Sequence, residues 1–235
     1  MKTGTALLTA FLVFSGTRIL TAAESSDTPI AEITVGIYHA ISQGNPTTDF
    51  IKAAETRINS EVFGGKTAIS FKVLFVKSLD ASELAKYKIG GAFDIDGVVP
   101  YLDKIRDATN PNLYLTLLPS RMGRCYSLDI ESLPEMKFVA GCDKPDILMV
   151  EEISGGSWEN KILMSNFLQR KNNPELFMHE LGHFLNLDHT ASALCQETQF
   201  VMCVGFDNAK LVFDAQYKQA WREFYYQRTG QKPPQ

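Results

Sequence analysis

One eleven-residue stretch, from His179 to His189, holds three of the four histidines in this 235-residue chain and reads HELGHFLNLDH. On an α-helix, residues i and i+4 lie on one face about one turn apart, so His179 and His183 can present two imidazoles to one metal ion. Glu180 lies beside the first of them. His189 can return as a third ligand if the chain turns sharply after Leu185. This spacing constrains the fold more than any other feature of the sequence.

The two helical histidines and the glutamate between them match HExxH, a pattern in which the histidines bind zinc and the glutamate is the general base. The turn that follows needs a residue that tolerates φ > 0, and Asn186 stands where glycine is most usual. A surface helix with unrelated histidines is the alternative, which the ligand spacing disfavours. We therefore expect His179, His183 and His189 to bind one catalytic Zn²⁺, while nothing in the sequence indicates a structural Ca²⁺.

The longer pattern HExxHxxNxxH resembles the HExxHxxGxxH signature of the metzincin zinc endopeptidases, with Asn186 in place of the glycine. The second mark of that family is a methionine in a tight turn beneath the metal, and Met202 matches it. By this resemblance the Met202 thioether forms an apolar floor under the imidazoles and is not a ligand. An ordinary core methionine is the alternative.

Hydrophobic periodicity predicts strands and helices in alternation over the first half of the chain, which is typical of an α/β fold with a mostly parallel sheet. The expected strands are 33–37, 69–75 and 113–118. One helix is expected to carry Ile51, Ala54, Ile58 and Val62 on one stripe and to end at Gly64, and another is expected around Pro100. The second half of the chain continues with apolar runs at 137–141 and 147–150, a helix at 158–170 and the motif helix at 174–185. It closes with a helix that ends near Gly230 and has an inward stripe of Phe213, Tyr217, Trp221 and Phe224.

This order of elements resembles an adamalysin/reprolysin-like metzincin catalytic domain. The resemblance implies a mixed five-stranded sheet, a zinc cleft, an upper subdomain at about 30–186 and a small C-terminal lower subdomain at about 187–230, so that the catalytic domain covers residues 24–230 and residues 231–235 form a tail. Thr190, where that subfamily has aspartate, and Cys203, which follows the turn methionine instead of preceding it, depart from the subfamily pattern.

The resemblance implies peptide-bond hydrolysis, in which Glu180 takes a proton from the attacking water and later passes it to the leaving amine. An extended peptide would pair with an exposed sheet edge near 138–141, and the loop at 204–210 would form a pocket wall. A secreted binding protein that keeps the zinc scaffold and occupies a partner is the alternative. A zinc hydrolase of non-peptide substrates is a third. The intact Glu180 favours an enzyme.

The N-terminus has the features of a secretory signal peptide. Lys2 precedes an apolar run at 6–14, and small residues at 21–23 predict cleavage near Ala23. An uncleaved anchor is the alternative, but the run is too short to span a bilayer. We expect a secreted, extracellular monomer that acts on extracellular protein or peptide substrates, with no inhibitory prodomain between residue 23 and the first strand.

Four cysteines in a secreted chain predict two disulfide bonds, with three pairings open. Cys125–Cys142 and Cys195–Cys203 close the most compact loops and are the expected pairs. Zinc ligation by cysteine is the alternative, but three histidines already complete the protein ligands of a catalytic site.

The charge balance argues against two classes of partner. The formal net charge is −4 and no long basic or acidic block occurs, so neither nucleic acid nor an anionic membrane is an expected partner. His39 follows the first strand and is expected to have no catalytic task. Glu151 and Glu152 are expected to be a solvated acidic pair rather than a second metal site.

Overall fold

The computed structural model describes residues 28–41, 44, 46–89, 92–120, 122–127, 137–138, 148–153, 155–158, 160–164, 174–203 and 211–235. The predicted signal peptide, Cys142, most of the predicted substrate edge (139–141) and the predicted pocket loop (204–210) lie outside these residues. Among the helices in the described ranges, none is long and apolar enough to cross a membrane.

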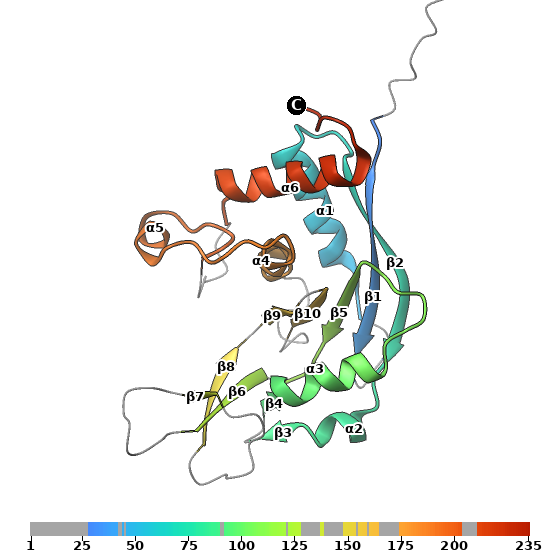
Figure 1. Ribbon diagram of the computed structural model, residues 1–235, viewed down its shortest axis with the longest axis vertical. Coiled ribbons are helices and arrows are strands. Elements are labelled where there is room, and N and C mark those ends of the chain that lie inside the picture. The colour runs from blue at the N-terminus through green and yellow to red at the C-terminus, as the bar shows by residue number, and fades with distance from the viewer. Residues whose placement is uncertain are drawn as a thin grey trace, which may run out of the picture.

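Five strands form the main sheet, in the order β2-β1-β5-β10-β9 (Figure 1). The first four run parallel to one another, and β9 is antiparallel to β10. The prediction of an α/β fold with a mixed, mostly parallel five-stranded sheet is confirmed. The strands are β1 (Ala31–His39), β2 (Ile69–Ser78), β5 (Leu113–Leu117), β9 (Gly155–Trp158) and β10 (Lys161–Met164).

Strand β10 of this sheet comes from a segment that was predicted to be helical. In its described residues the helix predicted at 158–170 is wrong, because Trp158 ends β9 and residues 161–164 form β10, which pairs with β9 and β5; residues 159 and 165–170 lie outside the described residues. All four residues of β10 are buried. A short, continuous apolar run fits either a buried helix or a strand covered on both faces, and periodicity alone does not separate them.

Helices cover both faces of the main sheet (Figure 1). On one face α1 (Asp49–Val62), α4 (Pro174–Phe184) and α6 (Ala215–Thr229) share a core with the β1 side chains Ile33, Val35 and Ile37. On the other face α2 (Ala81–Ala85) and α3 (Ile95–Lys104) pack against Tyr38, Tyr114 and Leu163. The predicted helices that carry the Ile51–Val62 stripe, around Pro100, at about 174–185 and before Gly230 are confirmed, but Phe213, predicted to lie on the last of these, precedes it. The short helix α5 (Ser192–Glu197) follows the predicted motif.

A second, smaller sheet lies beside the first and contains two of the predicted apolar runs. Its order is β3-β4-β6-β7, with β8 also paired to β6. The runs predicted at 137–141 and 147–150 contribute β7 and β8 to this sheet, so the described part of the predicted substrate edge does not border the main sheet. Its strands are β3 (Lys88–Ile89), β4 (Ala92–Asp94), β6 (Met122–Ser127), β7 (Lys137–Phe138) and β8 (Leu148–Ile153).

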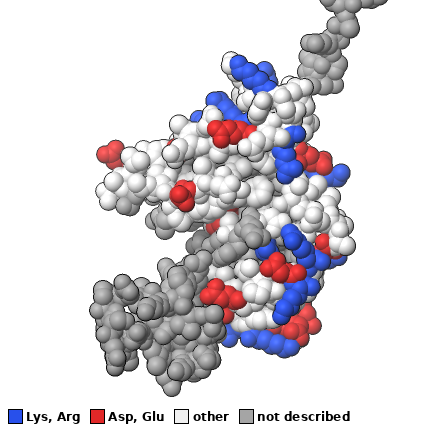
Figure 2. Space-filling view, in the orientation of Figure 1, with Lys and Arg blue, Asp and Glu red and all other residues white. Residues whose placement is uncertain are grey.

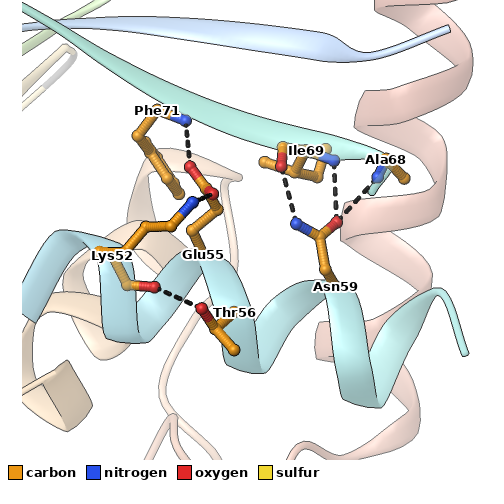
Figure 3. A network of polar contacts seen from close by, with 7 residues as sticks. All are labelled: Lys52, Glu55, Thr56, Asn59, Ala68, Ile69 and Phe71. Atoms are coloured by element: carbon orange, nitrogen blue, oxygen red, sulfur yellow. Dashed lines mark hydrogen bonds and ion pairs between the residues drawn. The ribbon is translucent and has the colours of Figure 1, made fainter. Parts of the chain in front are cut away.

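Side chains of α1 bond the backbone at the start of the edge strand β2 (Figure 3). Asn59 Nδ2 donates to the Ile69 carbonyl at 2.8 Å, and its Oδ1 accepts from the N–H groups of Ala68 and Ile69 at 2.9 Å each. Glu55 Oε2 accepts from the Phe71 N–H at 2.8 Å. Backbone groups on a sheet edge that would otherwise lack partners are thereby satisfied.

We expect Asn59→Ala to lower the free energy of unfolding by about 2 kcal/mol, because it leaves buried N–H and C=O groups without partners. The measurement is urea unfolding. Thr56→Ala is the matched control: Thr56 lies on the same helix, is exposed and also makes one side-chain hydrogen bond to the backbone. Equal losses for the two variants would contradict a special role for Asn59.

Positive and negative side chains are interspersed on the described part of the face shown in Figure 2. Some of the described ion pairs join different elements; for example, Lys161 Nζ on β10 lies 2.9 Å from Asp103 Oδ1 on α3. Arg57 of α1 reaches Glu175 at the start of α4, with 3.6 Å between Nη1 and Oε1.

Candidate metal centre

Helix α4 presents His179 and His183 one turn apart on the same side of the helix. The helix packs against α1, β9 and β10, and its residues 176–182 are all buried. His179 is only 6% exposed and Glu180 only 2%. Packing therefore holds the helix along most of its length, which fixes the backbone positions of its two histidines.

The chain reverses after α4 at Asn186, as the sequence predicts. Asn186 has a φ of 61°. Its N–H donates to the His183 carbonyl at 2.9 Å, and the Leu187 N–H donates to the Gly182 carbonyl at 3.0 Å. These two bonds make a Schellman motif, in which a left-handed residue satisfies the last free carbonyls of a helix. The turn sends the chain back along the helix towards His189.

The turn brings the third histidine to the other two. The ligand atoms of His179, His183 and His189 all lie within 4.8 Å of one another. The Nε2 atoms of His183 and His189 are 3.1 Å apart. Two nitrogens that share a tetrahedral zinc ion at about 2.0–2.1 Å lie roughly 3.3 Å from each other. The spacing of the rings therefore fits one zinc ion.

Backbone carbonyls orient two of the three rings. Nδ1 of His179 lies 2.6 Å from the Val201 carbonyl, and Nδ1 of His183 lies 2.8 Å from the Leu187 carbonyl. A carbonyl can only accept, so each Nδ1 carries the hydrogen and each Nε2 keeps its lone pair. Such bonds from the far nitrogen fix the tautomer and orientation of histidines that bind metals.

The protonation of the histidines also suits a metal ligand. Burial lowers the pKa of His179 to about 4. Burial and the nearby His183 lower the pKa of His189. Both rings are therefore neutral at neutral pH, and only the neutral ring can donate its lone pair to a cation.

Glu180 lies on α4 with its carboxyl group enclosed. Ser157 of β9 places its Oγ 2.8 Å from Glu180 Oε2 and 3.0 Å from the Glu180 carbonyl oxygen. Burial raises the pKa of the Glu180 carboxyl to about 7, and the hydrogen bond from Ser157 opposes that rise. A carboxyl whose pKa lies near 7 can both accept and return a proton at neutral pH.

Met202 lies in a turn beneath α4. The Cys203 N–H donates to the Phe200 carbonyl at 3.1 Å, and the Thr190 N–H donates to the Met202 carbonyl at 2.9 Å. A Cβ placed on Gly182 would lie 2.1 Å from Met202 Sδ and 3.2 Å from Tyr217 Cε2. Glycine at 182 therefore allows the methionine and the helix to pack closely.

We expect Gly182→Ala to lower the free energy of unfolding by about 2 kcal/mol. Without the clash, alanine in a helix would stabilise by roughly 1 kcal/mol, so the sign of the change tests the contact. Urea unfolding measures it. The same substitution in a Met202→Ala background should be much less harmful. Stabilisation by Gly182→Ala alone would show that Met202 is not packed against this position.

The disulfide bond Cys195–Cys203 is confirmed, and it joins α5 to the residue after Met202. The bond closes a loop within the segment that follows the third histidine, and this loop contains the methionine turn. The second predicted bond, Cys125–Cys142, cannot be assessed because Cys142 lies outside the described residues.

The fourth histidine lies away from the three-histidine group. His39 is buried at the end of β1, where its Nε2 lies 3.2 Å from Ser78 Oγ, and it is not part of the three-histidine group. Glu151 and Glu152 lie in β8. Ser157 was not predicted to lie at the site. A lone serine has no spacing signal, and its strand β9 was not predicted from the sequence.

No family model matches the chain, and no curated protein matches it. Among solved structures, the archaemetzincin of Methanopyrus kandleri is similar, with 15% sequence identity and a TM-score of 0.48. The match covers 83% of this chain and 96% of that one.

Proposed function

We propose that this protein is a zinc-dependent endopeptidase in which His179, His183 and His189 bind the ion and Glu180 is the general base. The observation that carries the proposal is the meeting of three imidazoles, two of them tied through Nδ1, beside a buried carboxyl group. A metzincin-type catalytic domain is part of the proposal, supported by the HExxHxxNxxH pattern and by the turn at Met202 beneath α4.

The chemistry divides between the ion and the chain. A zinc ion held by His179, His183 and His189 would lower the pKa of a water molecule to roughly 7 and would polarise the carbonyl of the substrate. Glu180 accepts the proton of the attacking water and then delivers it to the leaving amine. The rigid turn at Asn186 and the carbonyls of Val201 and Leu187 keep the rings in place throughout.

The proposed substrate is an extended segment of an extracellular protein or peptide, bound along β9. This strand is the end strand of the main sheet and lies against α4, next to Glu180. Main-chain groups on a sheet edge bind an extended peptide without regard to its sequence. In this proposal β9 replaces the edge near 138–141. Secretion is supported by the signal-peptide features of residues 1–23 and by the disulfide bond Cys195–Cys203.

The test is digestion of a mixed peptide library by the oxidised protein, with zinc, with a chelator, and with zinc restored after chelation. We expect cleavage that stops on chelation and returns with zinc. Cleavage that persists in the chelator would contradict the mechanism. A protein that binds zinc and cleaves no peptide would favour the binding protein or a hydrolase of other substrates.

A further inference from the structure

Ser157 links the edge strand β9 to the base on helix α4. Its hydroxyl lies within hydrogen-bond distance of two oxygens of one residue, at 2.8 Å from Glu180 Oε2 and 3.0 Å from the Glu180 carbonyl oxygen. Within the strand, Ser157 is paired with Ile162 of β10. Its position is therefore set by the main sheet, while the residue that it contacts belongs to the helix.

We propose that Ser157 is the positioning residue for Glu180, holding the carboxyl group in the orientation needed for proton transfer. This inference rests on the proposed peptidase function. A glutamate side chain has three rotatable bonds, and a carboxyl group that points away from the attacking water cannot act as a base. A hydrogen bond to a carboxylate is stronger than one between neutral groups, so one hydroxyl on a rigid strand can fix this orientation.

The geometry separates this role from substrate binding. Side chains of a strand stand roughly perpendicular to the sheet, whereas the main-chain groups that pair with a peptide lie in its plane. Replacing the Ser157 side chain therefore leaves the peptide-binding edge of β9 intact. The loss should appear in kcat rather than in KM.

The experiment compares Ser157→Ala and Ser157→Thr with the wild-type protein, all loaded with zinc, for kcat, KM and zinc content. Ser157→Ala should lower kcat about tenfold or more with KM and zinc content unchanged. An effect of this size is typical when a hydrogen bond to a charged group, here the Glu180 carboxylate, is lost. Threonine keeps the hydroxyl and suits a strand, so Ser157→Thr should restore most of kcat. Ser70→Ala, in β2 at the opposite end of the same sheet, is the matched control.

A second measurement needs no activity. In metal-free protein, the shift in the urea midpoint caused by Ser157→Ala should largely disappear in a Glu180→Ala background, because the contact is then already absent. If wild-type protein cleaves nothing, the peptidase proposal fails and this double-mutant cycle decides the contact. Full kcat in Ser157→Ala, or additive midpoint shifts, would overturn the inference while leaving the proposed function in place.

Discussion

Glu180→Gln is expected to lower kcat for peptide cleavage by roughly 10²–10⁴-fold, the range typical of a lost general base. Glutamine has nearly the same shape, and its amide oxygen can still accept the hydrogen bond from Ser157. It cannot take up a proton at neutral pH. The three imidazoles are untouched, so the zinc content should equal that of the wild-type protein. Steady-state kinetics on one peptide, with metal analysis of the same samples, measures both.

The matched control is Glu175→Gln, which removes a carboxylate from the first turn of the same helix. Glu175 is paired with Arg57 across the start of α4 and is not one of the residues assigned to the site. Its replacement should leave kcat within about twofold. A Glu180→Gln protein with full zinc and near-normal kcat would show that another group accepts the proton.

The parts of the fold with a long, regular pattern were predictable from the sequence. Helix α1 carries one apolar stripe over 14 residues, and the first five residues of β1 alternate between buried and more exposed positions. Such lengths give the hydrophobic period enough repeats to identify the element. The turn at Asn186 was also predictable, since a third histidine at position 189 requires a left-handed residue soon after the helix.

Short elements buried on both faces could not be assigned in this way. The four residues of β10 are all buried, so they show no alternation that would separate a strand from a helix. Only the pairing of β10 with β5 and β9 decides the matter, and sequence periodicity contains no information on pairing. The four-residue edge strand β9, next to the motif helix, was not predicted either.

In the candidate site, too, the residues with a local sequence pattern were predictable and their distant partners were not. The spacing of His179, His183 and His189 is a local signal, and the structure brings their ligand atoms together. The groups that orient them are not local: Val201 lies 22 residues from His179, and Ser157 lies 23 residues from Glu180. Backbone carbonyls and a single serine have no residue-type signature, so only the fold reveals these partners.

Glu180→Gln is also expected to stabilise the metal-free protein at alkaline pH. Burial raises the pKa of the Glu180 carboxyl from 4.5 to about 7. The folded protein therefore holds a proton that the unfolded chain has lost between these values. This stability is fully present below about pH 4.5 and is lost as the pH rises through 7. Glutamine has no such dependence.

Glu180→Gln should accordingly gain about 3 kcal/mol in unfolding free energy relative to wild-type protein between pH 4.5 and pH 8, both kept metal-free with a chelator. His179 has a lowered pKa, so its contribution runs in the opposite direction, being lost as the pH falls from 6.5 through about 4. It is present in both proteins and cancels in the difference. Glu197→Gln, in the exposed helix α5, controls for the change in net charge.

A difference that stays flat from pH 4.5 to pH 8 would mean that water reaches the Glu180 carboxyl in the folded protein. The expected slope means instead that α4 and β9 enclose an ionisable group at a cost to stability. A buried carboxyl is tolerated in a metal-free fold only at such a cost, and a nearby cation would offset it by favouring the charged form. Zinc should therefore stabilise wild-type protein more than Glu180→Gln at pH 8.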